Sequence, residues 1–233
     1  MHTAAGRSDL ASRLLLNETY PSWGYSIRHG ATTTWERWDG WTETRGFQTP
    51  AMSSLNHYSF GAIGEWLYRS VAGIDQAREA LAYDRIVIRP ELGGGLTWAQ
   101  ATYHSVRGVI AAAWKRDRDR FELEIRVPAN TSATIVLPSA SVDSVLEGGR
   151  PLGEVDGVDV VGTETNSVVV SVGSGDYVFG VAPLWAAGVV ADQARETASR
   201  PVARRRVTRR RNALLHQSAC GMPAEAIDAG RVP

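Results

Sequence analysis

Residues 121–127, near the middle of the chain, alternate strictly between apolar and charged side chains. The odd-numbered positions hold Phe, Leu, Ile and Val, and the even-numbered positions hold Glu, Glu and Arg. This period of two predicts a β-strand with one buried and one exposed face. Short strand-like segments at regular spacing on both sides of it predict an antiparallel β-sandwich over about residues 84–181. These segments, separated by Gly, Pro, Asn and Asp, cover residues 85–90, 97–103, 109–114, 132–137, 142–146, 167–172 and 177–181.

The first 75 residues have a helical pattern instead. Residues 8–20 repeat Leu and Ala at the spacing of one helix face, and Pro21 is expected to end that helix. Residues 22–52 are rich in Gly, Thr and Trp and predict a long loop, and long loops in compact domains are usually functional. A second helix is predicted from Ser53 or Ser54 to about Ala72, with Gly73 after its end. The sequence therefore predicts an α+β chain, with helices at 1–75 followed by the sandwich.

The last part of the chain, residues 182–233, loses the strand pattern. It contains two arginine triplets within residues 204–211 and is otherwise rich in Ala, Gly and Pro, so we expect a disordered basic tail. The whole chain nevertheless balances 25 Lys and Arg against 25 Asp and Glu. A net charge of zero favours neither nucleic acid nor a membrane surface as a partner. We therefore expect no specific nucleic-acid partner and no membrane partner.

The side chains that hold metals or phosphates do not form a recognisable motif. The five His are scattered, and Gly93-Gly94-Gly95 precedes a strand-like segment, which indicates a turn and not a phosphate loop. We expect no metal and no cofactor. The single Cys220 excludes an internal disulfide, and neither a signal peptide pattern nor an apolar run of about 20 residues is present. A cytoplasmic location is the expectation.

The stretch from Trp35 to Trp41 places three indoles, two carboxylates and one guanidinium within seven residues. Indole faces stack on the C–H faces of sugars, while carboxylates bind hydroxyls and transfer protons. The mixture therefore favours sugar chemistry. The alternative from these residues alone is a Trp-rich corner of the core whose charged side chains point to water.

Three segments in this order resemble the bacterial α-L-rhamnosidases. They are residues 19–25 (TYPSWGY), 30–40 (GATTTWERWDG) and 54–68 (SLNHYSFGAIGEWLY). The resemblance extends over roughly residues 8–181. It implies an inverting glycoside hydrolase, with a catalytic six-hairpin (α/α)6 barrel followed by a C-terminal β-sandwich. It also implies α-L-rhamnosides or rhamnose as ligands.

The resemblance also implies roles for individual residues. Glu36 matches the catalytic general base, which in an inverting enzyme activates water on the face opposite the leaving group. His57 stands in the same Asn-His-Tyr context as a sugar-contacting histidine of the family, near the start of the predicted second helix. Trp35, Trp38 and Asp39 are candidates for substrate binding.

The residues themselves leave alternatives open for each role. Glu36 has the alternative of an ion pair with Arg37 or Arg28. Asp39 precedes a glycine, and Asp-Gly is a common turn pair. The alternative for His57 is a structural role, as a hydrogen-bonded polar residue between packed helices. Glu65, four residues before Arg69 on the predicted helix, is better explained as an ion pair.

The sequence contains too few helices for a complete barrel. Six hairpins need twelve helices, on the order of 140 residues before loops are counted. The general acid of the family belongs to an upstream motif that is not found in this sequence. We therefore expect the C-terminal part of an α-L-rhamnosidase that is inactive alone and is completed by a missing N-terminal part. One alternative is a sugar-binding β-sandwich module without catalysis, and another is a nucleic-acid-binding protein. The sugar-binding module is expected to expose aromatic side chains on one sheet face, whereas Trp98 and Trp114 are predicted as core residues.

Overall fold

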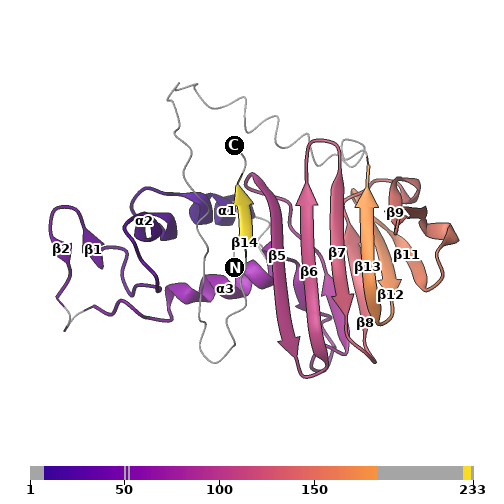
Figure 1. The fold of residues 1–233 in the computed structure, drawn as a ribbon, viewed down its shortest axis with the longest axis horizontal. Coiled ribbons are helices and arrows are strands. Elements are labelled where there is room, and N and C mark those ends of the chain that lie inside the picture. Colours follow the sequence, from indigo (N-terminus) through magenta and orange to yellow (C-terminus); the bar gives the residue numbers. More distant parts are fainter. Residues whose placement is uncertain (1–7, 50, 52, 183–227, 232–233) are drawn as a thin grey trace.

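The structure of the chain is a computed structural model that describes residues 8–49, 51, 53–182 and 228–231. Helices and a small hairpin occupy one end of the molecule, and two β-sheets form the rest (Figure 1). Among the described residues, no helix combines the length and apolar character that a membrane crossing requires. The helical elements are α1 (Ser8–Leu16), α2 (Trp23–Arg28), η2 (Phe60–Ala62), α3 (Ile63–Trp66) and the π-helical η3 (Leu67–Val71).

A seven-stranded and a five-stranded sheet make up the sandwich, as the period-two segments predict. The seven-stranded sheet has the order β10-β9-β13-β7-β6-β5-β14, and the five-stranded sheet has the order β11-β12-β8-β4-β3. The strands are β3 (Ile74–Gln76), β4 (Arg85–Ile88), β5 (Leu96–Ser105), β6 (Gly108–Arg116), β7 (Phe121–Val127), β8 (Ser132–Leu137), β9 (Val145–Glu147), β10 (Arg150–Pro151), β11 (Val158–Glu164), β12 (Ser167–Val172), β13 (Gly175–Val181) and β14 (Asp228–Arg231).

The sheets differ from the prediction in one pairing and in some strands. β4 and β8 run parallel, whereas all other pairs in the two sheets are antiparallel. Between them the chain crosses to the other sheet and forms β5, β6 and β7, and such a long crossover permits a parallel return. The period-two pattern does not include β3, β10, β11 or β14. β11 was not predicted because it lies at a sheet edge and is mostly exposed, so apolar and polar side chains do not alternate along it.

The expected tail, residues 182–233, falls mostly outside the described residues. Its residues 228–231 form β14, which pairs with β5 at the edge of the seven-stranded sheet. The expectation of a tail without regular structure is therefore wrong for these four residues. An unpaired sheet edge offers backbone groups to an added strand, whatever the local side-chain pattern.

One hydrophobic core joins the two parts of the chain. The largest fully buried side chains of the sandwich are Trp114, Phe121 and Phe179. Leu67, Val71 and Ala72, from the end of the helical region, belong to the same buried cluster. Leu15, Leu16, Ile63 and Trp66 are partly buried against that cluster.

A buried hydrogen bond and a glycine are central to the junction between helix and sandwich. Trp114 Nε1 donates to the Val71 carbonyl at 2.7 Å. Gly73 then turns the chain with φ +84°, and a Cβ at this position would lie 2.3 Å from the Pro90 backbone nitrogen. No other residue fits there, because both the conformation and the space require glycine. The prediction that Gly73 follows the helix end is confirmed.

The first helix is shorter than predicted. α1 ends at Leu16, whereas the sequence pattern placed the end near residue 20. Asn17 Oδ1 accepts hydrogen bonds from the backbone N–H and the hydroxyl of Thr19. This local turn competes with the helix for backbone partners, so the helix stops before the proline.

The segment predicted as a loop, residues 22–52, contains α2 and a hairpin formed by β1 (Trp41–Thr42) and β2 (Gly46–Phe47). Ser22 caps α2, because its side chain accepts a hydrogen bond from the Tyr25 backbone N–H at 2.9 Å. The second helix begins at Phe60 and not at Ser53 or Ser54. The prediction that His57 lies on this helix is therefore wrong.

Candidate functional site

Two chain segments, residues 33–36 and 54–57, lie side by side and carry the main candidates. The Glu36 backbone N–H donates to the Ser54 carbonyl at 2.9 Å, and the His57 N–H donates to the Thr34 carbonyl at 2.7 Å. The Thr33 hydroxyl also donates to the Leu55 carbonyl. These bonds explain why residues 54–57 are not helical, since their backbone groups bind the facing segment. They also bring Glu36 and His57 into one small region of the chain.

The Glu36 carboxylate is fixed by the backbone of the facing segment. Its Oε2 accepts a hydrogen bond from the Ser54 N–H at 2.8 Å, in addition to the main-chain bond between the same residues. The side chain is half-buried. The alternative of an ion pair between Glu36 and Arg37 or Arg28 does not hold, because Arg37 binds Asp39 and Arg28 binds Glu18. One carboxylate oxygen is thus oriented by the protein, and Oε1 has no partner in the described part of the chain.

His57 has one ring nitrogen engaged. Its Nδ1 accepts a hydrogen bond from the Ser59 backbone N–H at 3.2 Å, and its ring stacks on Tyr58 with centroids 4.9 Å apart. An acceptor role for Nδ1 places the proton of the neutral ring on Nε2. The imidazole can therefore donate a hydrogen bond from Nε2 to a ligand hydroxyl.

The tryptophans of the motif pack against their neighbours. Trp38 stacks on Phe60 with centroids 3.8 Å apart, and Trp23 meets Trp38 edge to face at 5.0 Å. Trp23 Nε1 also donates to the Phe60 carbonyl at 3.2 Å. Trp35 is only 6% exposed. These contacts connect α2, the motif loop and the start of the second helix.

Asp39 is held by cations and an amide. Arg37 binds it through two hydrogen bonds, Nε to Oδ1 at 2.9 Å and a terminal nitrogen to Oδ2 at 3.1 Å. Gln48 donates to Oδ2 at 3.1 Å, and Arg45 lies 3.5 Å from the same oxygen. The Gly40 N–H donates to the Arg37 carbonyl, which closes a turn. This arrangement fits the turn alternative for Asp39 and leaves both of its oxygens engaged.

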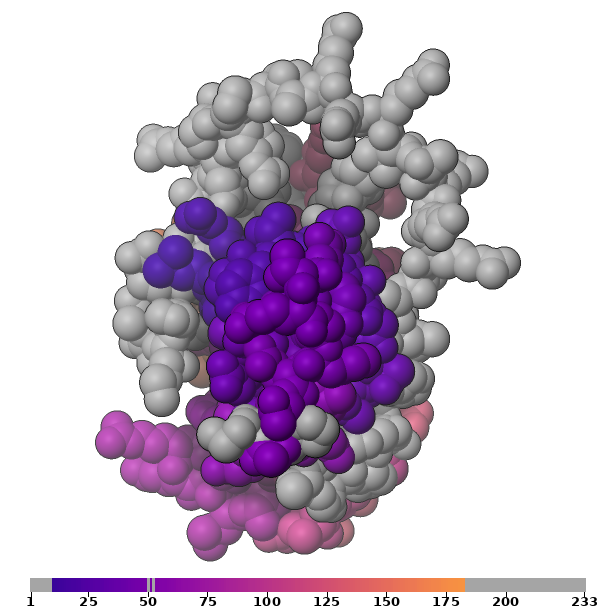
Figure 2. Space-filling model, turned by 90° about the vertical axis from the view of Figure 1, so that its left-hand side faces the viewer, coloured from indigo at the N-terminus to yellow at the C-terminus, as the bar shows by residue number. Residues whose placement is uncertain are grey.

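A shallow hollow of about 390 Å³ lies beside the hairpin. Glu36 and His57 do not line it, so it is separate from the paired segments. Figure 2 looks onto this end of the molecule, where the described N-terminal residues form a rounded lobe in front of the strands. The hollow is lined by Tyr20, Tyr25, Asp39, Thr42, Glu43, Thr44 and Arg45.

Ser54, which holds the Glu36 carboxylate, is not among the site residues predicted from the sequence. Ser54 acts through its backbone N–H, which every residue except proline carries, so its identity gives no signal. Phe60, the stacking partner of Trp38, is likewise not distinguished from a core aromatic by its sequence context. The ion pair predicted between Glu65 and Arg69 is present at 2.7 Å. Within the described ranges, no cluster of three or more His, Cys, Asp and Glu is arranged to hold a metal ion.

Two family models match the chain in succession. Residues 1–71 match the bacterial α-L-rhamnosidase six-hairpin glycosidase domain, and residues 73–150 match the bacterial α-L-rhamnosidase C-terminal domain. The boundary between the two matches falls at the junction of Val71 and Gly73. The order of helices followed by a β-domain agrees with these matches.

Individual relatives and solved structures agree with the family models. An α-L-rhamnosidase of Streptomyces avermitilis is 41% identical over 179 residues, which is 77% of this chain and 16% of the relative. The crystal structure of the Streptomyces avermitilis enzyme complexed with L-rhamnose superposes with a TM-score of 0.68 at 40% identity, covering 77% of this chain and 16% of that one. The α-L-rhamnosidase structure from Dictyoglumus thermophilum superposes with a TM-score of 0.66 at 31% identity, covering 78% of this chain and 19% of that one. The chain therefore spans less than a fifth of the length of these proteins.

Proposed function

Because the chain belongs to the bacterial α-L-rhamnosidase family, we propose that it supplies the general base of an inverting α-L-rhamnosidase. Glu36 is that base. The observation that carries the proposal is the clamp on Glu36, in which Ser54 binds both its backbone and one carboxylate oxygen. An oriented carboxylate with a second oxygen available can accept a proton from an attacking water.

The proposed reaction transfers the rhamnosyl group to water. Glu36 Oε1 takes a proton from the water as the water oxygen bonds to the anomeric carbon. The bond from that carbon to the leaving oxygen breaks, and a separate general acid protonates the leaving oxygen. Attack from the opposite face inverts the anomeric configuration. His57 donates from Nε2 to a sugar hydroxyl and so holds the ring during the reaction.

The three remaining candidates have contacts that suit a supporting role. Trp38 holds the motif loop against Phe60, Trp35 packs in the interior, and Asp39 ties the hairpin to Arg37. Direct contact of Trp35, Trp38 or Asp39 with sugar stays a prediction. A rise in KM for Trp38→Leu in an active enzyme, without loss of thermal stability, would support it.

The chain of 233 residues is not expected to hydrolyse rhamnosides alone. Cleavage needs two carboxylates, and the paired segments supply one. Asp39, the next carboxylate along the motif, is occupied by Arg37, Arg45 and Gln48. Loss of acid assistance removes about 10²–10⁴-fold of rate. A turnover of roughly 1–10³ s⁻¹ on an aryl α-L-rhamnoside, typical of enzymes, would contradict this expectation.

A chimera tests the role of Glu36. The matching region of the Streptomyces avermitilis enzyme is replaced by residues 8–181 of this chain, and hydrolysis of an aryl α-L-rhamnoside is measured. Glu36→Gln should lower kcat by about 10²–10⁴-fold with little change in KM, because the amide cannot accept the proton. The matched control is Glu43→Gln, on an exposed hairpin side chain, which should leave kcat unchanged. Retention of most activity by Glu36→Gln would show that another group is the base.

His57→Ala in the same chimera separates binding from proton transfer. The variant should raise KM by about tenfold, the loss expected when a charge-neutral hydrogen bond to a ligand is removed. His57→Gln retains a donor and should recover part of that loss. An unchanged KM for His57→Ala would remove His57 from the site.

A further inference from the structure

The outer face of the seven-stranded sheet carries a half-buried tryptophan that the core does not use. On the inner face of β5 and β6, Ala99, Ala101 and Ala112 are fully buried. Trp98 points the other way and is half-buried, so its prediction as a core residue is wrong. Trp114, predicted with it, is 2% exposed and does belong to the core.

Trp98 faces outward by the ordinary alternation of β5, because Ala99 and Ala101 are buried and the register with β6 is unbroken from Trp98 to Ser105. Trp98 pairs with Gly230 of β14 and Leu96 pairs with Arg231, so Thr97 is an extra residue on β5. This irregularity lies before Trp98 and allows Leu96 to turn to the inner face, where it is buried. The residue opposite Trp98 on β14 is glycine, so no side chain from that position covers the indole.

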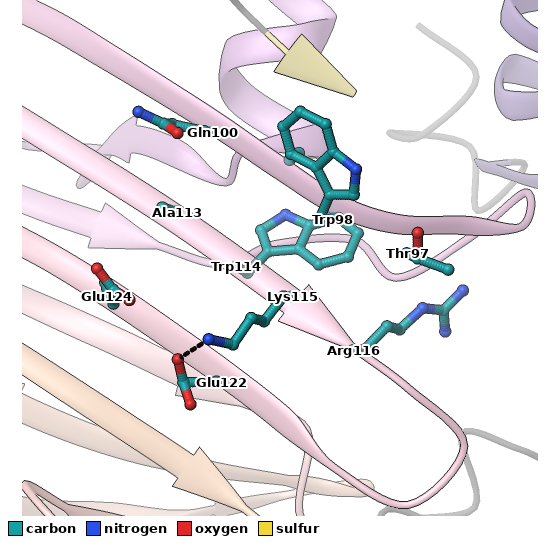
Figure 3. A pocket seen from close by; sticks show the side chains of 10 residues that line it. Thr97, Trp98, Gln100, Ala113, Trp114, Lys115, Arg116, Glu122 and Glu124 are labelled. Atoms are coloured by element: carbon teal, nitrogen blue, oxygen red, sulfur yellow. Dashed lines mark ion pairs between the residues drawn. The ribbon is translucent and has the colours of Figure 1, made fainter. Parts of the chain in front are cut away.

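Polar side chains and one small residue surround the indole on three adjacent strands. They border a shallow hollow of about 440 Å³ on the sheet (Figure 3). Ala113 of β6 lies between longer neighbours, and its short side chain leaves the hollow open. The strand register gives two rows across β5, β6 and β7: Trp98, Lys115 and Glu122 in one, and Gln100, Ala113 and Glu124 in the other.

The chemistry of this hollow suits a neutral polyhydroxylated ligand. An indole offers an apolar plane for the C–H face of a sugar, and it carries an N–H donor. Gln100 offers a donor and an acceptor, and Glu124 offers acceptors for hydroxyl groups. Neither Trp98 nor Gln100 has a side-chain hydrogen bond to the described residues. As far as the described residues are concerned, both side chains keep these groups for a ligand.

The charges argue against the other common occupants of a sheet face. Lys115 pairs with Glu122 at 2.5 Å, and Arg116 and Glu124 add one charge of each sign to the lining. A face with balanced charge does not attract nucleic acid or an anionic membrane. A protein partner would need a wide apolar centre, whereas here one indole is ringed by polar groups.

We propose that this face, the Trp98 surface, binds a rhamnose-containing polysaccharide at a place separate from the candidate catalytic site. The assignment of rhamnose rests on the proposed function, while the assignment of a saccharide rests on the residues of the surface. Its role is to hold a polymeric substrate near the enzyme. Stacking on one indole with few hydrogen bonds gives weak binding, with Kd expected near 10⁻⁴–10⁻³ M.

Affinity electrophoresis of the full chain of 233 residues tests the proposal. A neutral rhamnan, a polymer of rhamnose, is cast in a native gel, and a gel with rhamnose-free dextran, which is also neutral, is run beside it. The chain should be retarded by the rhamnan and not by dextran. Trp98→Ala should weaken the retardation by about tenfold or more, and Trp98→Phe should recover part of it.

A second variant tests the same surface in case a substitution of Trp98 disturbs folding. Ala113→Gln fills the hollow from an outward-facing position without removing any core atom, and it should also weaken retardation by about tenfold. Phe47→Ala removes an exposed aromatic side chain from the hairpin and should leave retardation unchanged. Thermal melting of each variant shows whether it is folded.

Several outcomes would overturn the inference. They are the absence of retardation for the unmodified chain, equal retardation by dextran, and unchanged retardation in both Trp98→Ala and Ala113→Gln. Loss of retardation in His57→Ala with retention in Trp98→Ala would place the sugar at the candidate catalytic site instead. Failure of the proposed function is distinguishable, because Trp98→Ala in the chimera should leave kcat on a small aryl rhamnoside unchanged.

Discussion

The sandwich and the loop region that precedes it are held together by different kinds of hydrogen bond. In the sandwich, backbone groups of neighbouring strands pair with each other over long registers, such as the seven pairs of β7 and β13. In residues 17–59, short turns and bonds from side chains fix the backbone, as at Asn17, Ser22 and Ser54. The candidate catalytic residues lie in the second kind of structure. The segments with a regular apolar period therefore form the scaffold, and the segment without such a period carries the candidate catalytic residues.

The two regions still share one core, which allows their comparison to be tested by substitution. Leu67, Val71 and Ala72 are buried among sandwich residues. The loop region reaches the sandwich mainly through the helix that ends at this junction. Substitutions in the sandwich core, at the junction and on the surface should therefore lower the free energy of unfolding by different amounts. They should also loosen different parts of the chain.

The largest effect is expected in the centre of the sandwich. Phe179→Ala removes a fully buried ring and should lower the free energy of unfolding by about 3–5 kcal/mol. Phe47→Ala, the matched control on a ring that is 66% exposed, should change it by less than about 0.5 kcal/mol. Urea unfolding measures both. Similar losses for the two variants would mean that the sandwich core does not dominate stability.

The next effect is expected at the junction. Trp114→Phe keeps most of the ring but leaves the Val71 carbonyl without its donor, which should cost about 1–3 kcal/mol. Hydrogen exchange should show greater loss of protection in residues 63–71 than in β12, because the lost bond anchors the helix. Equal loss in both places would show that the helix end is no more dependent on Trp114 than the distant strands are.

A pH-dependent effect is expected at Tyr83, which packs against Tyr103 with ring centroids 4.8 Å apart. Burial, with the neighbouring Tyr103, raises the pKa of Tyr83 to about 12 from about 10. The stabilisation is fully present below pH 10 and is lost as the pH rises from about 10 to about 12, because the unfolded chain deprotonates first. The loss is at most about 2 kcal/mol, because Tyr83 is only half-buried and solvent screens its interactions.

Comparison with Tyr83→Phe isolates this contribution from those of the other tyrosines and lysines. The difference in unfolding free energy between the two proteins should shift in favour of the Phe variant over the same pH range. A difference that stays constant between pH 9 and pH 12 would show that Tyr83 titrates alike in the folded and unfolded states.

The smallest effect is expected for an exposed ion-pair bridge between the two regions. Arg69 binds Glu65 on the helix at 2.7 Å and Asp75 on β3 at 2.8 Å. Arg69→Gln should cost at most about 1 kcal/mol, since such pairs are screened by solvent. The cost should shrink in 1 M NaCl. A larger, salt-independent cost would indicate that the arginine stem packs on the junction.

The sequence predicts the sandwich well because its strands repeat with a period that burial imposes. Residues 121–127 could hardly form another element, and they form β7 with every second side chain buried. The same reasoning fails for β11, since Val160 and Val161 are both exposed and no face is marked. It also fails at Trp98, because the alternation of β5 places Trp98 on the outer face with Gln100 although a tryptophan is expected in the core.

The candidate site is predictable in its chemistry and not in its geometry. The motif around Glu36 and the Asn-His-Tyr context of His57 make both residues candidates by resemblance, and their roles stay predictions. The pattern of residues 54–59 predicts a helix, but Ser54 and His57 donate their backbone N–H groups to the facing loop instead. Such long-range backbone bonds leave no local signal, so the clamp on Glu36 appears only in the structure.

The central claim, that the loop-held Glu36 is the general base, is tested most directly by chemical rescue. In the chimera, Glu36→Gly should hydrolyse an aryl α-L-rhamnoside at least about 10²-fold more slowly. Added azide should restore the rate, since azide can attack the anomeric carbon from the vacated side without a base. NMR should then show a rhamnosyl azide of inverted configuration, released as the aryl oxygen is protonated by the general acid. A near-normal rate for Glu36→Gly, or a slow variant that azide does not rescue, would contradict the claim.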